Sequence, residues 1–187
     1  MFDRETSAIQ ENYVAEVLDM KQAGVEWVTM ISAASETVKL LRDMRTQGFS
    51  PAVVDLGQQY YGPELLAEPA AEGSLVTLSI VPFEEVVSSP ALGAYLDAYA
   101  ASAGDGAPLP TALGVNAFSA GLLFATAAAA LGDDLTRENL LGQLQTITSW
   151  DGGGLHAPAN PGERAVPTCF AYLHVVDGAF ERLHPAG

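Results

Sequence analysis

Ser119 is the residue whose sequence context comes closest to a catalytic motif. Residues Ala117–Gly121 (AFSAG) are close to the G-x-S-x-G pattern, which exposes a nucleophilic serine at a sharp strand-to-helix turn. Possible acids and bases follow it in the chain, namely Asp133, Asp134, His156 and His174. The motif needs a strand running straight into the serine, whereas residues 110–116 are weak strand formers and alanine replaces the first glycine. We therefore expect a small helix residue that allows close packing, and we keep a serine hydrolase using Ser119 as an alternative function.

The histidines and the single cysteine lack the spacing of a metal site. None of the short separations typical of zinc ligands occurs among His156, His174, His184 and Cys169. Cys169 has no partner in the chain, so we expect either a small buried side chain or half of a bridge to another polypeptide. The glycines Gly152–Gly154 are not followed by a lysine or a capped helix, which favours a turn over a phosphate loop. We expect neither a metal nor a cofactor.

Two successive helix–strand units near the amino end could position a binding site. Helical patterns at Ala15–Gly24 and Glu36–Gly48 each end in a glycine, which adopts the left-handed conformation easily after a helix. Short apolar strands follow at Val25–Ile31 and Ala52–Leu56. Helices that alternate with such strands predict an α/β fold with a parallel sheet flanked by helices.

Ligands bind beyond the carboxyl ends of the strands in sheets of this kind. The expected binding edge therefore comprises Ser32–Ser35 and Asp55–Tyr60. Ser35 is expected to cap the second helix. We expect Tyr60 and its neighbour Tyr61 to pack under their loop rather than to contact a ligand.

The pattern changes after a third expected strand, Ser74–Val81, because helices then follow without strands between them. Ser89, followed by proline, begins the first of these helices. Thr111–Leu131 is nearly all apolar and is expected to be buried on most sides. Thr136 caps the next helix. The Asp177–Gly178 pair predicts a β-hairpin close to the end of the chain.

Charge and hydropathy narrow the classes of function. The chain has 23 acidic and 8 basic residues, a formal net charge of −15, and no basic cluster. Such a surface repels nucleic acid, so no nucleic-acid partner is expected. The uncharged stretch Ala107–Gly132 is long enough to span a bilayer, but its prolines, polar side chains and many alanines favour a buried helix. Residues Met1–Asn12 lack a signal-peptide pattern.

Segments spread over nearly the whole chain carry a resemblance to a known family. They are MKQAGVEWVTM (20–30), LLRDMRTQGFSPAVV (40–54), AAEGSLVTLSIVPF (70–83), SPALGAYLDAY (89–99), NAFSAGLLFATAAAAL (116–131), LTRENLLGQLQTI (135–147), DGGGL (151–155) and VVDGAF (175–180). In this order and spacing they resemble the branched-chain amino-acid type of substrate-binding protein, the type I periplasmic-binding-protein fold used by ABC importers.

The resemblance implies a division of the chain into parts of two lobes. Members of the family have two α/β lobes joined by crossing strands, with the ligand between the lobes. Residues 1–82 would form an α/β unit of the second lobe, residues 83–149 the helical portion of an incomplete first lobe, and residues 150–187 a return to the second lobe with a C-terminal hairpin. The chain is thus expected to be the carboxy-terminal half of such a protein.

By position, the resemblance implies ligand contacts at Ser32, Ala33, Asp55 and Gln58. Members that bind amino acids commonly carry an aromatic residue after the first strand, where this chain has Ser32, Ala33 and Ala34. They also carry a carboxylate after the second strand, a part that Asp55 could take. The alternative for Asp55 is a loop aspartate that caps the next turn.

The implied function is that of a substrate-binding fragment of an ABC-type importer, which binds a small polar solute such as an amino acid or amide without catalysis. Its partners would be that ligand and an ABC permease, and the full-length family is periplasmic or at the cell surface. The chain as written has no export signal. Cleft closure needs two lobes, so another alternative is a truncated chain with no independent ligand binding. Its helices between residues 90 and 147 would then expose apolar faces and invite self-association.

Overall fold

The computed structural model describes residues 3, 5–7, 9–104 and 106–183. The chain divides into two compact units, one made of Met1–Thr77 with Tyr172–Gly187 and the other of Leu78–Ala171. The expected division into lobe segments at residues 1–82, 83–149 and 150–187 stays a prediction.

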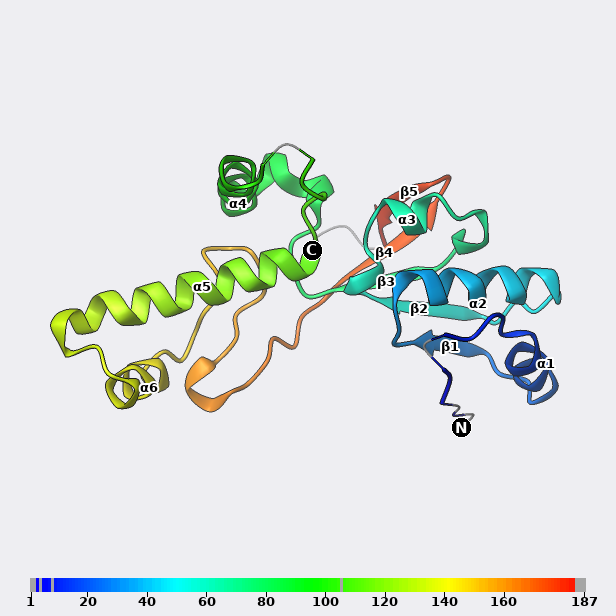
Figure 1. Ribbon diagram of the computed structural model, residues 1–187, viewed down its shortest axis with the longest axis horizontal. Helices are drawn as coiled ribbons and strands as arrows, with labels where there is room; N and C mark the ends of the chain where they lie inside the picture. Colours follow the sequence, from blue (N-terminus) through cyan, green and yellow to red (C-terminus); the bar gives the residue numbers. More distant parts are fainter. Residues whose placement is uncertain (1–2, 4, 8, 105, 184–187) are drawn as a thin grey trace. The chain divides into compact units, whose positions relative to one another are not determined.

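The first unit contains the helix–strand repeat expected from the sequence, followed by a hairpin (Figure 1). Its elements are α1 (Val14–Gln22), β1 (Trp27–Met30), α2 (Ala34–Thr46), β2 (Val53–Gly57), η1 (Gln58–Tyr60), α3 (Pro63–Leu66), η2 (Pro69–Ala71), β3 (Leu75–Leu78), β4 (Ala171–Val176) and β5 (Ala179–Arg182). The third strand is thus shorter than the expected Ser74–Val81.

The strands form one five-stranded sheet in the order β1-β2-β3-β4-β5. β1 pairs with β2 in parallel, from Trp27 opposite Val53 to Met30 opposite Leu56. β2 also pairs with β3 in parallel, whereas β4 and β5 are antiparallel. The predicted α/β fold with a parallel sheet and flanking helices is therefore confirmed, with an antiparallel hairpin at one edge.

Glycines end the first two helices as the sequence indicates. Gly24 and Gly48 follow α1 and α2 with φ of 64° and 59°, in the left-handed region that glycine enters without a Cβ clash. The start of α2 differs from the expectation. Its N-cap residue is Ala33, which has no side-chain cap, and Ser35 lies inside the first turn. The cap predicted at Ser35 is wrong because the chain becomes helical at Ala34, before it reaches the serine.

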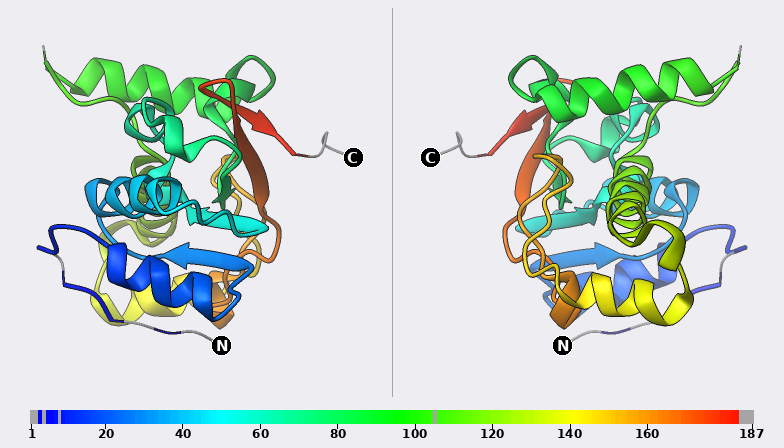
Figure 2. Two further views of the ribbon diagram at one scale, coloured as in Figure 1. Left: turned by 90° about the vertical axis from the view of Figure 1, so that its right-hand side faces the viewer. Right: turned by 90° about the vertical axis from the view of Figure 1, so that its left-hand side faces the viewer.

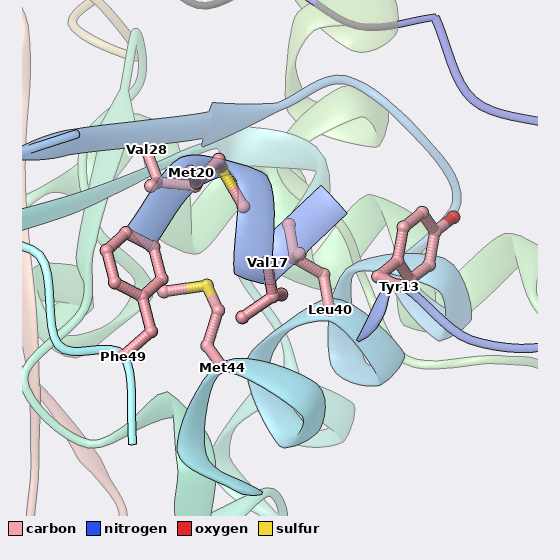
Figure 3. Packing of buried hydrophobic residues seen from close by; sticks show 7 residues of the cluster. All are labelled: Tyr13, Val17, Met20, Val28, Leu40, Met44 and Phe49. Carbon is pink, nitrogen blue, oxygen red and sulfur yellow. The ribbon is translucent and has the colours of Figure 1, made fainter. Parts of the chain in front are cut away.

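Both helices bury one side against the same face of the sheet. A core cluster joins the start and body of α1, the middle of α2, β1 and the loop after α2 through Tyr13, Val17, Met20, Val28, Leu40, Met44 and Phe49 (Figure 3). On β1 the buried Val28 alternates with exposed neighbours, and Trp27 is 57% exposed. This alternation shows that the helices cover one face of β1 and leave the other face open.

The second unit is mainly helical (Figure 2). Its elements are η3 (Phe83–Ser88), α4 (Pro90–Ser102), α5 (Ala112–Leu131), η4 (Gly132–Asp134), α6 (Arg137–Gln145) and η5 (Pro161–Glu163). The predicted caps are confirmed, since the hydroxyls of Ser89 and Thr136 accept hydrogen bonds from the first turns of α4 and α6. Both α4 and α6 pack against α5.

The long helix α5 is less buried than its composition led us to expect. Only Ala112, Val115, Ser119 and Ala127 are buried along its length. Leu113 and Phe124 are 55% and 53% exposed. The prediction that this helix is buried on most sides is wrong, because its neighbours in the unit cover only one stripe of it.

By length and composition alone, the segment Ala112–Asp134 could cross a membrane, and it is the one such helix found among the described residues. A single helix of this kind is weak evidence, because core helices of soluble proteins have the same composition.

Two features near the carboxyl end test further expectations. The hairpin between β4 and β5 is confirmed, and both turn residues, Asp177 and Gly178, have the positive φ of a two-residue hairpin turn. Cys169 is a free, exposed cysteine, so the expected burial of this side chain is wrong. It lies just before β4, in a segment without regular structure.

A buried polar network fixes the segment before α1 on α2. The Tyr13 hydroxyl donates to Glu36 Oε2 at 3.0 Å, and Lys39 Nζ lies 2.8 Å from Glu36 Oε1. The hydrogen bond from Lys39 lowers the pKa of Glu36, with a further contribution from Tyr13, although burial opposes this shift. Burial, together with the neighbouring Glu36 carboxylate, raises the pKa of Tyr13 to about 12.

We expect the stability of the protein to fall as the pH rises from 10 to about 12 through the ionisation of Tyr13. The folded state holds the phenolic proton more tightly than the unfolded state, so removing that proton favours unfolding. Urea unfolding at several pH values across this window, followed by circular dichroism, measures the effect. The Tyr13→Phe variant should lose this part of the pH dependence, and an unchanged slope in that variant would contradict the assignment to Tyr13.

Candidate functional site

The loops expected to bind a ligand leave the sheet at the same edge. β1 and β2 are parallel and paired in register. The connections that follow them, after Met30 and Gly57, therefore begin at the same edge of the sheet. Ser32 and Ala33 lie in the short connection between β1 and α2, and Gln58 begins η1 directly after β2. The strand arrangement required for a binding edge is therefore present.

Tyr60 joins these two connections. Its hydroxyl accepts a hydrogen bond from the Ser32 N–H at 2.7 Å, and its own hydrogen can be donated to the carbonyl oxygen of Ser32 at 2.9 Å or of Met30 at 3.0 Å. The side chain is 3% exposed. The burial of Tyr60 and Tyr61 is consistent with packing under the loop, as expected, and Tyr60 also fixes the main chain after β1.

Ser32 and Ala33 present small side chains at this edge. Ser32 is partly buried and Ala33 is exposed. Because Ala33 is the N-cap residue of α2, its position is set by the start of that helix as well as by β1. These residues offer a hydroxyl and a methyl group in place of an aromatic ring.

Asp55 lies within β2 rather than in the loop after it. Its register partners are Thr29 on β1 and Leu75 on β3, and the Thr77 hydroxyl donates to Asp55 Oδ1 at 2.8 Å. Asp55 therefore does not cap the next turn, because it lies two residues before the end of the strand. The hydrogen bond to Thr77 depends on the register between β2 and β3, which the sequence alone does not reveal.

Gln58 is partly buried at the start of η1, and its carbonyl oxygen accepts the N–H of Tyr61. The structure thus brings Ser32, Ala33 and Gln58 to the edge where β1 and β2 end, while Asp55 lies on the sheet itself. Whether these residues contact a ligand stays a prediction.

A second polar cluster, in the other unit, surrounds Ser119. Ser119 Oγ lies 2.7 Å from His156 Nε2 and accepts a hydrogen bond from Trp150 Nε1 at 3.0 Å. His156 Nδ1 lies 2.9 Å from the carbonyl oxygen of Ala157. A carbonyl oxygen can only accept, so Nδ1 carries a hydrogen. In the neutral form of the imidazole ring, Nε2 then accepts the Ser119 hydroxyl hydrogen.

A short Ser–His contact is one requirement of a serine nucleophile, but the remaining geometry differs from a catalytic site. Ser119 lies in the middle of α5 and is 3% exposed, whereas a nucleophile elbow presents the serine on a strand-to-helix turn. His156 is oriented by a main-chain carbonyl rather than by a carboxylate. The cluster connects α5 to the segment 150–157 and satisfies polar groups that this packing buries.

The glycines of the segment after Trp150 fit this packing. Gly152, Gly153 and Gly154 all have positive φ, as predicted for a turn. A Cβ at Gly152 would lie 2.7 Å from Ser119 Oγ, too close for any side chain. The glycine therefore allows the turn to approach the serine directly.

No metal site is present among the residues that the structure describes, because no three His, Cys, Asp or Glu side chains gather closely enough to hold an ion. His184 lies outside the described residues.

Comparison with known proteins identifies the family. A family model described as periplasmic binding protein matches residues 3–178. The chain belongs to the periplasmic binding protein family. The comparison with curated proteins found no match. The resemblance inferred from the sequence segments is therefore confirmed at the level of the family and the fold.

Solved structures of the same fold come from several bacteria. A branched-chain amino acid ABC transporter protein from Thermus thermophilus with bound valine is 19% identical, with a TM-score of 0.78, and the match covers 97% of this chain and 50% of that one. A possible leucine/isoleucine/valine-binding protein from Rhodopirellula baltica SH 1 is 19% identical, with a TM-score of 0.76 and coverage of 97% and 48%. A fatty acid ABC transporter substrate-binding protein from Thermomonospora curvata is 21% identical, with a TM-score of 0.72 and coverage of 94% and 46%. The chain spans about half the length of these relatives.

We expect Ser119 to support the fold rather than catalysis. Replacing Ser119 by alanine leaves Trp150 Nε1 and His156 Nε2 without their shared partner, which should lower the free energy of unfolding by roughly 1–3 kcal/mol. Urea unfolding monitored by tryptophan fluorescence measures the loss. Ser149→Ala, at an exposed position in the same part of the chain, should change it little and serves as the matched control.

A fluorophosphonate probe tests the hydrolase alternative directly. The buried serine should remain unlabelled in the folded protein. Labelling that maps to Ser119 by mass spectrometry, and that Ser119→Ala abolishes, would establish a reactive nucleophile and overturn the structural role.

Proposed function

We propose that the chain is a substrate-binding fragment of an ABC-type importer, which contributes one wall of a cleft for a small polar solute and catalyses no reaction. Membership of the periplasmic binding protein family supports this function. The observation that carries the proposal is the meeting of the connections after β1 and β2 at one edge of a parallel sheet, joined by Tyr60. An ABC permease would be the partner, and the periplasm or the cell surface the location, of the full-length protein.

The proposed ligand is an amino acid or a small amide. Ser32 and Gln58 can donate hydrogen bonds to a carboxylate and can both donate to and accept from an amide. Ala33 presents only a methyl group beside them. Asp55 could meet a ligand ammonium only if the ligand reaches the sheet surface, where Thr77 already donates to one of its oxygens. Structural relatives are described with bound valine and as a fatty acid transporter protein, which favours testing apolar as well as polar ligands.

Binding by this chain alone should be weak. Ligand affinity in a closing cleft comes from two walls that bury the ligand, and the proposed site supplies one. The relatives are about twice as long as the aligned part of this chain, so the second wall would come from the other half of a full-length protein. A chain without independent ligand binding is the alternative to this proposal.

The direct test is a ligand titration followed by amide chemical shifts in NMR spectra of the labelled chain. With valine, glutamine, acetamide and octanoate as probes, we expect the ligand that binds to shift the amides of Ser32, Ala33 and Gln58. The dissociation constant should lie in the millimolar range, equivalent to about −4 kcal/mol. Gln58→Ala should weaken binding, whereas Gln59→Ala, at the exposed neighbouring position, should not.

Three results would contradict the proposal. No shift at this edge with any of the probes would favour a chain without independent ligand binding. Shifts confined to residues away from this edge would place the site elsewhere. Micromolar affinity for the isolated chain would show that one wall is sufficient and that the two-wall argument is wrong.

We further propose that the exposed side of α5 drives self-association of the isolated chain. Leu113 and Phe124 are eleven residues apart, about three helical turns, and so lie on the same side of the helix. Both are more than half exposed, at 55% and 53%, which leaves apolar surface in contact with water.

Sedimentation velocity over a range of protein concentrations tests this association. The wild-type chain should show concentration-dependent association, and the double variant Leu113→Gln/Phe124→Gln should reduce it without changing the circular dichroism spectrum. Glu138→Gln, on the first turn of α6, is the control. A wild-type chain that stays monomeric at the highest concentration would rule out this role for α5.

A further inference from the structure

The hydroxyl of Tyr60 lies at a point where three main-chain groups of another segment converge. It is within hydrogen-bond distance of the N–H and the carbonyl oxygen of Ser32 and of the carbonyl oxygen of Met30. Tyr60 itself belongs to η1, after β2, so these contacts connect residues 28 and 30 positions apart in the sequence. At 3% exposure, the Tyr60 side chain is shielded from water, so its hydroxyl depends on these main-chain partners.

The segment that Tyr60 contacts runs from Met30, the last residue of β1, into a connection without regular structure. Residues 31–33 lie between the end of β1 and the start of α2, and Ile31 is 92% exposed. Ala33 has no side chain that can cap α2. The phenol thus acts as a fixed hydrogen-bonding partner for a turn that neither the sheet nor the helix includes.

We propose that Tyr60 is a positioning residue of the binding edge, whose hydroxyl holds the Ser32 main chain and thereby sets the places of the Ser32 and Ala33 side chains. This inference rests on the proposed function of that edge. It goes beyond the predicted contact set, because Tyr60 would act through Ser32 without touching the ligand. The same hydrogen bond also limits which Ser32 groups a ligand can contact. The Ser32 N–H already donates to Tyr60, so the Ser32 hydroxyl is the group that would contact the ligand.

The test compares Tyr60→Phe with Tyr61→Phe. Each variant removes one hydroxyl from a buried tyrosine of the same segment, and the Tyr61 ring packs on Phe180 with ring centroids 4.7 Å apart. Amide hydrogen exchange of the full chain, measured by NMR, should show faster exchange at Ser32 in Tyr60→Phe by roughly tenfold or more, because the amide loses its acceptor. Exchange at Val53, whose N–H donates to the main-chain carbonyl oxygen of Glu26, should stay unchanged. Tyr61→Phe should leave Ser32 as in the wild type.

These readouts separate positioning from general destabilisation. A purely structural role would speed exchange at Ser32 and Val53 together, and that result overturns the proposal. Unchanged exchange at Ser32 in Tyr60→Phe also overturns it.

The ligand titration then separates this proposal from the proposed function. If the wild-type edge responds to a ligand, Tyr60→Phe should weaken the response at Ala33 and Tyr61→Phe should not; equal affinity in Tyr60→Phe overturns the positioning role. If no ligand shifts the wild-type edge, the proposed function fails, and the exchange at Ser32 still decides whether Tyr60 orders the turn.

Discussion

The parallel pairing of β1 with β2 is the constraint on which the rest of the first unit depends. It brings residues that are far apart in sequence into register, from Trp27 beside Val53 to Met30 beside Leu56. Parallel strands require a crossover between them, and α2 supplies it while burying Leu40 and Met44 in the core cluster. Because of the same pairing, the connections after β1 and β2 begin at one edge of the sheet, so Ser32 and Gln58 lie at the same edge. An antiparallel pairing would have placed them at opposite ends of the sheet.

Buried hydroxyl groups hold the segments that lie outside the helices and strands. In the first unit, the Tyr60 hydroxyl holds the turn after β1. In the second, the Ser119 hydroxyl joins Trp150 and His156 to the middle of α5. Each hydroxyl is almost fully buried and is satisfied by partners within its own unit, so the cost of burying it is offset only when the segment lies in one place. This explains how turns without regular structure can have a defined conformation.

How far the sequence could predict this structure depends on whether a feature is local. Gly24, Gly48, Ser89, Thr136 and the Asp177–Gly178 turn act within a few residues of their positions, and the structure agrees with the expectations at each. The order of the first strands followed from alternating helices and apolar runs. The start of α2 was misjudged by residue type, since a serine was available but the chain became helical before reaching it.

The edge at which β1 and β2 end was predictable, but the contacts within it were not. The edge followed from the parallel strands, yet the contacts of Asp55 with Thr77 and of Tyr60 with Ser32 depend on register and on long-range packing. The apolar composition of α5 also led to a wrong prediction of its burial. Its apolar residues indicated burial on most sides, but burial requires a partner, and the unit covers only one stripe of the helix.

One face of β1 in the first unit and one side of α5 in the second are exposed for the same reason, which is that no other described part of the same unit packs against them. Parallel sheets are found with helices on both faces, yet only one face of β1 is covered here and Trp27 remains 57% exposed. The long helix α5 likewise leaves Leu113 and Phe124 in contact with water. In relatives of about twice the length, additional polypeptide is available to cover such surfaces. Within this chain, Tyr60 and the parallel strands order the connections after β1 and β2, while the burial that gives a closing cleft its affinity requires a second wall.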